Sequence, residues 1–465
     1  MILRQLLCSP ITSFIWLLFA LITFYIDIGT SLADHNRYLL YVYISYFLCL
    51  YCWIGRGNRV LSLFVLFVLF SLFYNTSQSF VYAITKDFSF LHIYNSYTLA
   101  DVCYMLKYEF LCISGFCLGI SVYLNKKSHN VSHNEVVLYY KKKRKENNNM
   151  NRFFIIFVIC SIAVFAYTIY QLILRQTISY GELYESRETI SPYFSLGTML
   201  IGLYYILIKC HVKLVLLLYV WFIFAYTLAG TRSMTIVYIG ALFLIIPILY
   251  PQYFQRKYYP LIFALILLGF FSISVFSQLR NSSIGSTMAL ETNNMPIYLA
   301  SLKEMGISQL STLITIDNFD KAPYSQTIFY FVLLSFIPSF ILESVLPESW
   351  GLRLGSWVTN ISNTTYVQWG SSWIAESYLN FGQFGWLFTF LYGYLIVYAE
   401  NSSLRRILRG DYLLSICVLT CLCKQLFFAR AEIHLLVDYF KPCIYILAIY
   451  YLTKKESKKT LVVRK

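Results

Sequence analysis

The sequence predicts an all-α, polytopic membrane protein with about 12 transmembrane helices, and three observations predict it: composition, apolar runs and charge distribution. Hydrophobic residues make up 58% of the 465 residues and charged residues only 13%, which suits a chain surrounded by lipid. Runs of roughly 17 to 25 apolar residues are long enough to cross a bilayer as helices. Such runs are found at 10–26, 38–54, 60–77, 105–124, 153–174, 193–208, 213–229, 233–250, 259–276, 377–398, 411–428 and 435–452.

The third observation is the uneven distribution of the net charge of +15 among the connections between these runs. With the N-terminus inside, the inner connections hold most of the Lys and Arg residues, above all the segments 125–152 and 454–465. Because Lys and Arg in short connections set the orientation of the spans, both termini are predicted to be cytoplasmic. The positive charge is therefore a topology signal, and it does not indicate nucleic-acid binding.

The spans and connections divide the chain into three regions. Residues 1–276 are predicted to hold transmembrane helices 1 to 9, with 125–152 as a basic cytoplasmic loop. Residues 277–376 form one large outer loop, and residues 377–465 hold helices 10 to 12 and a basic tail. No internal repeat relates the two halves of the chain, whereas many secondary transporters show one.

The large outer loop is expected to be folded, because it is too long for a simple connection and too apolar and aromatic to be disordered. Its segment 327–346 is strongly apolar and contains Pro338. A span there would invert the charge distribution downstream, so we expect a helix that lies at the interface or re-enters the membrane. Four tryptophans are expected either to anchor the headgroup boundary or to stack on carbohydrate rings: Trp350, Trp357, Trp369 and Trp373.

Arginines recur on the predicted outer turns. Arg232 follows Gly230 in a tight turn, and Arg280 follows Gln278 at the exit of a span. One arginine at this level can snorkel to a lipid phosphate. Several of them in an otherwise acidic outer region favour a dianionic or polyanionic ligand such as a pyrophosphate, because guanidinium groups match phosphate oxygens bidentately. The set is Arg187, Arg232, Arg280, Arg353 and Arg430.

The stretch WIAESYLNFGQFGWLF at 373–388 places one acid, Glu376, just before an apolar run. A carboxylate at a low-dielectric boundary tends to keep its proton, which suits a general base near neutral pH. The alternative is a charge near a helix N-terminus that interacts with the helix dipole. On the residues alone both interpretations stay open. Gly382 and Gly385 are expected to permit close helix packing.

The order of these features resembles the bacterial O-antigen polymerases, the Wzy or oligosaccharide repeat unit polymerase family. In architecture the resemblance covers the whole chain, and short motifs carry it in detail. The matching residues are Gly230 and Arg232, Gln278 and Arg280, Ile337 and Pro338, the group Glu376, Tyr378, Asn380, Phe381, Gly382 and Gly385, and Arg430.

The resemblance implies a GT-C-like, lipid-carrier-dependent glycosyltransferase of the bacterial inner membrane, with the large loop and the active site at the periplasmic face. Its substrates would be undecaprenyl-pyrophosphate-linked repeat units for lipopolysaccharide O-antigen, without a cofactor or a metal. Membrane lipids, a chain-length regulator and a flippase would be its partners. Glu376 and Arg280 would be catalytic, and binding of the pyrophosphate and sugar would fall to Arg187, Arg232, Gln278, Arg353, Tyr378, Asn380 and Arg430.

Two other functions compete with this one. An O-antigen ligase uses the same kind of donor, but its family carries a His in the large loop, whereas the six histidines here lie elsewhere. A flippase or other transporter is expected to place ionisable residues inside its spans. The candidates here, Lys107, Glu109 and Lys424, are expected near span ends, so the polymerase is favoured.

Overall fold

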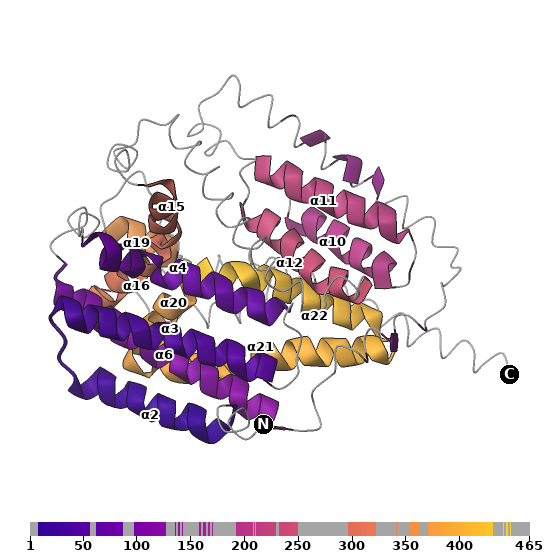
Figure 1. The fold of residues 1–465 in the computed structure, drawn as a ribbon. Helices are drawn as coiled ribbons and strands as arrows, with labels where there is room; N and C mark the ends of the chain where they lie inside the picture. The colour runs from indigo at the N-terminus through magenta and orange to yellow at the C-terminus, as the bar shows by residue number, and fades with distance from the viewer. Residues whose placement is uncertain are drawn as a thin grey trace.

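The computed structural model of the chain describes residues 8–55, 62–86, 97–126, 192–207, 211–228, 232–249, 296–321, 354–361 and 371–430, with isolated residues elsewhere. Every regular element in these ranges is an α-helix or a short 3-10 helix. The all-α prediction is therefore confirmed for the described part of the chain. Figure 1 shows the long helices lying side by side.

The first four described helices run in alternating directions: α2 (Pro10–Ile26), α3 (Leu32–Gly55), α4 (Leu63–Thr85) and α6 (Leu99–Asn125). Phe24, near the end of α2, contacts Tyr104, near the start of α6, with ring centroids 5.2 Å apart. The His35 ring, near the start of α3, meets the Tyr82 ring, near the end of α4, edge-on, with centroids 4.8 Å apart. By length and composition α3, α4 and α6 can each cross a membrane.

Polar caps begin these helices where the sequence turns from polar to apolar. Before α2, the Ser9 side chain accepts a hydrogen bond from the backbone N–H of Thr12. Before α6, Thr98 and Asp101 form a capping box, in which each side chain accepts from the backbone of the other. Each cap satisfies amide donors that have no partner within the first helical turn. The predicted span at 105–124 is therefore α6, which begins earlier, at its cap.

α6 lies at the centre of this group and packs against α2, α3 and α21 (Gly385–Leu408). Glycines bring the backbones of α6 and α21 into contact. A Cβ atom at Gly119 would overlap the carbonyl oxygen of Phe390, and one at Gly393 would overlap that of Phe116. Small residues of this kind allow membrane helices to approach closely.

A second group of helices packs beside α22 (Tyr412–Gln425), as Figure 1 shows: α10 (Pro192–Leu207), α11 (Val212–Leu228) and α12 (Arg232–Leu249). Buried hydroxyl groups join these helices. The Tyr219 hydroxyl donates to the Met199 carbonyl at 2.7 Å, and Thr198 and Tyr238 share a hydrogen bond of 2.9 Å. The predicted spans at 193–208, 213–229 and 233–250 match the three helices to within one residue at each end.

Part of the predicted outer loop is folded into the bundle. It supplies α15 (Ile297–Met305), α16 (Ile307–Asp317), the 3-10 turn η3 (Phe319–Lys321) and α19 (Leu354–Ile361), which lie at one end of the bundle in Figure 1. α16 packs against α4, α6 and α20 (Trp373–Phe381), and its residues 308–315 are all buried. This helix is therefore a component of the core and not a cover over it.

The prediction of one continuous helix at 377–398 was wrong. α20 ends at Phe381, the 3-10 turn η5 (Gly382–Phe384) follows, and α21 begins at Gly385. Gly382 has a φ of 55°, a left-handed backbone conformation that favours glycine and ends a helix. Apolar residues lie on both sides of the turn, but Asn380, Gly382, Gln383 and Gly385 interrupt the run. Gly382 is the local signal of the break, although from the sequence it was interpreted as a packing residue.

Several expectations lie outside the described residues. They concern the apolar segment 327–346 apart from Ile341, the span at 259–276, and most of the spans at 153–174 and 435–452. The number of spans, a re-entrant helix in the large loop and the three-region division therefore stay predictions.

The contact between α6 and α21 leads to a test of the packing. Gly119→Val should lower the free energy of unfolding by about 2 kcal/mol, because its side chain would meet backbone that has no room to move. The midpoint of thermal unfolding in detergent measures this effect. Ser121→Ala is the control, since the Ser121 hydroxyl bonds only the Leu118 carbonyl of its own helix. Equal midpoints for the two variants would contradict the close contact.

Candidate active site

The helix that carries Glu376 is short and enclosed. Ser372 is its N-cap, with the side-chain oxygen accepting from the backbone N–H of Ala375 at 3.0 Å. From Trp373 to Ser377 the side chains are fully buried. α20 is therefore surrounded by other helices, and its place depends on the contacts that it makes with them.

Two hydrogen bonds hold the N-terminal end of α20. The Ser372 hydroxyl shares one of 2.9 Å with the Thr312 hydroxyl of α16. The indole N–H of Trp373 donates to the Ser71 hydroxyl of α4 at 2.8 Å, and Tyr46 shares a bond of the same length with Ser71. Elements from three distant parts of the sequence thus meet at the start of this helix.

Tyr108 of α6 holds the other end. Its hydroxyl shares a hydrogen bond of 2.9 Å with Ser377 and donates to the Gly382 carbonyl at 3.3 Å. The Tyr108 ring also meets the Tyr378 ring edge-on, with centroids 4.8 Å apart. On its other side Tyr378 packs edge-on against Phe319 of η3 at 5.2 Å.

Glu376 lies in the first turn of α20 with 0% of its surface exposed. Its backbone N–H donates to the Ser372 carbonyl at 2.9 Å, and its carboxylate interacts electrostatically with Tyr392 of α21. An interaction with the helix dipole contributes about 1 kcal/mol, whereas removing a carboxylate from water costs several kcal/mol. The dipole alone therefore does not account for a glutamate at this position.

The predicted site residues are described to different extents. Tyr378 and Asn380 share α20 with Glu376, and the Asn380 side-chain amide donates to the Glu376 carbonyl at 2.8 Å. Arg232 begins α12 and Arg430 ends the 3-10 helix η6 (Leu426–Arg430), but their side chains are outside the described part. Four residues lie wholly outside it: Arg187, Gln278, Arg280 and Arg353.

The backbone nevertheless brings two of these elements together. η6 packs against α4, α12 and α20. Phe428 within η6 meets the Tyr392 ring edge-on at 5.3 Å, and Tyr392 is the residue with which Glu376 interacts. The helix that ends at Arg430 therefore adjoins the helix that carries Glu376.

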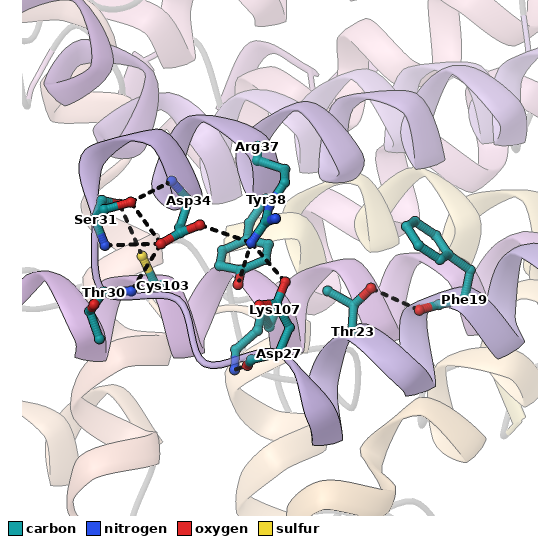
Figure 2. Close-up of polar contacts among 10 residues, drawn as sticks. All are labelled: Phe19, Thr23, Asp27, Thr30, Ser31, Asp34, Arg37, Tyr38, Cys103 and Lys107. Carbon is teal, nitrogen blue, oxygen red and sulfur yellow. Dashed lines mark hydrogen bonds and ion pairs between the residues drawn. The ribbon is translucent and has the colours of Figure 1, made fainter.

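A charged cluster at the turn between α2 and α3 was not predicted (Figure 2). One Arg37 nitrogen, Nη2, donates to the carboxylates of Asp27 at 2.7 Å and Asp34 at 2.8 Å. Lys107 of α6 donates to the Asp27 backbone carbonyl at 2.7 Å. Arg37 also lies over the Tyr38 ring, 5.0 Å from its centroid. Lys107 joins this cluster to α6. Because Asp27 and Asp34 both face Arg37, the charge of Arg37 is already balanced and the cluster is not an open anion site.

The three ionisable residues expected near span ends have different surroundings in the structure. Lys107 reaches the α2–α3 turn, and Lys424 lies in the last turn of α22. Glu109, in contrast, is fully buried within α6, where the side-chain amide of Gln309 from α16 donates to its Oε2 at 3.3 Å. The partner is separated by 200 positions, so no local sequence signal indicated this contact.

Exposed acids lie where α16 ends. Asp317 and Asp320 are both exposed, while burial and the neighbouring Asp317 raise the pKa of Tyr97. Among the described residues, no group of three or more His, Cys, Asp or Glu side chains has an arrangement that could hold a metal ion. Because Asp317 and Asp320 are both exposed, we interpret them as solvated residues at a helix end.

The described helices, three of them long and apolar enough to cross a membrane, define an all-helical integral membrane protein, and the short helix that carries Glu376 is enclosed in its core. Residues 12–460 match the family model described as O-antigen polysaccharide polymerase Wzy. The chain belongs to this family, which confirms the resemblance found in the sequence. The family's function, polymerisation of O-antigen polysaccharide, is favoured over that of a ligase or a flippase. Comparisons with curated proteins and with solved structures gave no match.

The double contact of Tyr108 can be tested by removing one oxygen. Tyr108→Phe keeps the ring packing but loses the hydrogen bonds to Ser377 and Gly382, so the free energy of unfolding should fall by about 1 to 2 kcal/mol. Thermal unfolding in detergent measures the change. Tyr25→Phe serves as the control, because Tyr25 is more than half exposed. If both variants unfold at the same temperature, Tyr108 does not hold the end of α20.

Proposed function

We propose that this polymerase acts at the periplasmic face of the bacterial inner membrane on undecaprenyl-pyrophosphate-linked repeat units. The growing polymer is transferred from its lipid carrier to the non-reducing end of a new repeat unit. Family membership supports the substrate class. We choose this site because Glu376 is fully buried on a short helix that contacts hold at both ends.

Glu376 is proposed as the general base of the transfer. The acceptor hydroxyl oxygen forms a bond to the anomeric carbon of the donor, and the bond from that carbon to the pyrophosphate breaks. Glu376 takes the hydroxyl proton, while the pyrophosphate leaves on its lipid with the bonding electrons. Since the Glu376 side chain is covered, the acceptor would reach it only when neighbouring segments open, as lids and loops do in many enzymes.

The arginines are proposed to neutralise the pyrophosphate, with Arg280 as the second catalytic group. Guanidinium groups directed at the leaving group stabilise the charge that develops there. The packing of η6 against α20 supports a place for Arg430 in this group. Arg187, Arg232 and Arg353, with Gln278, complete the proposed set, and Tyr378 and Asn380 are proposed to contact the substrate beside Glu376.

Cytoplasmic termini and a periplasmic site are also proposed. Basic residues gather at the end of α21, where Arg405 and Arg406 lie in its last turn. At the α2–α3 turn, by contrast, Asp27 and Asp34 offset the charges of Arg37 and Lys107. The basic end of α21 supports the orientation in which the large loop faces the periplasm. A chain-length regulator and a flippase remain proposed partners.

The proposed function is tested by supplying purified lipid-pyrophosphate repeat units to liposomes that contain this protein alone. A ladder of chain lengths is expected. Repeat units that cross the bilayer without being joined would favour a flippase instead.

Two buried glutamates allow a matched test of the proposed base. Glu376→Gln should reduce long chains to background, because an amide does not take up the acceptor proton. Glu400→Gln should keep them: Glu400 is just as buried, but its Oε2 accepts from the backbone N–H of Phe64 at 3.0 Å, and an amide oxygen can also accept. Gel analysis of the products, at equal membrane levels, separates the two. A normal ladder from Glu376→Gln removes Glu376 from the mechanism.

The proposed role of the arginines gives a further expectation. Arg280→Ala should abolish long chains while the protein still inserts into the membrane, because the leaving pyrophosphate loses a charge that stabilises it. If guanidinium groups supply this charge without a metal, addition of EDTA should leave the ladder of the wild-type protein unchanged. Loss of the ladder with EDTA, restored by Mg²⁺, would contradict metal-independent transfer.

A further inference from the structure

α16 enters the bundle at a tight contact with α4. Gly306, between α15 and α16, lies so close to α4 that a Cβ atom there would press on the backbone of Gln78. The side-chain amide of Gln78 donates to the Lys303 carbonyl, and the Ser308 hydroxyl donates to the Tyr74 carbonyl at 2.7 Å. The start of α16 is therefore fixed against α4 by backbone contact as well as by side chains.

Gln309 then joins α16 to two helices at once. Its Oε1 accepts from the Ser79 backbone N–H at 3.1 Å, and its Nε2 donates to the Ser79 hydroxyl at 3.0 Å and to Glu109 Oε2 at 3.3 Å. Both the donor and the acceptor end of this buried amide are thus used. Burying an amide without hydrogen bonds makes folding less favourable. The bonds of Gln309 therefore favour one position and one rotation of α16.

Thr312 lies about one turn further along the same helix, and there α16 meets α20. The Thr312 and Ser372 hydroxyls share a hydrogen bond of 2.9 Å, and the Ser372 oxygen also accepts from the Ala375 N–H as the N-cap. The Ser372 carbonyl accepts from the backbone N–H of Glu376. One residue therefore connects α16 to the turn that carries the proposed base.

We propose that Thr312 is a positioning residue for the transfer reaction, and that Gln309 seats α16 so that Thr312 reaches Ser372. This inference rests on the proposed function, because it concerns the placement of Glu376. Thr312 does not touch the substrate in this scheme. It fixes the N-cap of α20, and α20 in turn directs the Glu376 carboxylate.

The test compares two threonines on one helix. Thr312→Val keeps the shape of the side chain and removes its hydroxyl. Thr315→Val is the matched control: Thr315 is also fully buried on α16, but its hydroxyl bonds only the Ser311 carbonyl of the same helix. In the liposome assay, Thr312→Val should lower kcat roughly tenfold or more with an unchanged KM, since a small misplacement of a catalytic group costs rate. Thr315→Val should match the wild type.

Two further variants separate positioning from stability. Thr312→Ser restores the hydroxyl and should recover most of the wild-type kcat. Ser372→Ala with Thr312→Val should lose no more than the stronger single variant, because both remove the same contact. Equal kcat for the Val variants at 312 and 315, or no recovery with Ser, would overturn the proposal. If Thr312→Val does not accumulate in membranes, Gln309→Met gives the same comparison with the same expected loss of kcat.

The outcome for the wild-type protein keeps this inference distinct from the proposed function. A wild-type protein that forms no ladder overturns the proposed function itself. A wild-type ladder together with an unaffected Thr312→Val variant overturns only the positioning role.

Discussion

The fold depends on one constraint: polar groups inside a membrane protein must find partners within the protein, because lipid offers none. α4 carries a buried polar stretch, from Ser71 to Ser79, in the middle of an otherwise apolar helix. The Ser71 hydroxyl accepts a hydrogen bond from the indole of Trp373 on α20, and the Ser79 hydroxyl accepts one from the side-chain amide of Gln309 on α16. The stretch thereby selects which elements lie beside α4, and both come from the far end of the sequence. Apolar packing alone would accept many arrangements of these helices, whereas these bonds are made in one.

The sequence analysis located helices well and their partners poorly, for the same physical reason. Helix existence depends on apolar runs and caps that are local, so α10, α11 and α12 were predicted to within one residue. The break between α20 and α21 depends on the conformation of Gly382, and the environment of Glu109 depends on Gln309, 200 positions away. Gly382 is a local signal for a helix end that was interpreted as a packing residue, whereas the contact of Glu109 is not encoded in any short window. Membership of the family was predictable because it rests on motif order along the chain, which needs no tertiary contact.

Charge illustrates the same limit at the candidate site. Arginines on outer turns were selected by their level in the membrane, and Arg37 meets that criterion as well as the five that were chosen. The structure shows that the charge of Arg37 is already balanced, because Asp27 and Asp34 both accept from its guanidinium group. Position along a span indicates where a cation lies, but only its neighbours show whether its charge is already balanced. η6, which ends at Arg430, packs against α20. This contact says more about where Arg430 lies than its position in the sequence does.

Among the described residues, three glutamates are fully buried, and each lies in a different setting. Glu400 accepts from the backbone at the start of α4, and Glu109 accepts from the amide of Gln309, so each carboxyl joins two elements of the fold. Glu376 sits on a helix that is already fixed by Ser372 and Trp373 at one end and by Ser377 and Gly382 at the other. The helix therefore has several anchors besides the Glu376 carboxyl, whose burial costs free energy. A buried carboxyl on a helix that has other anchors supports a role in chemistry, because buried carboxyls with altered protonation gather at functional sites.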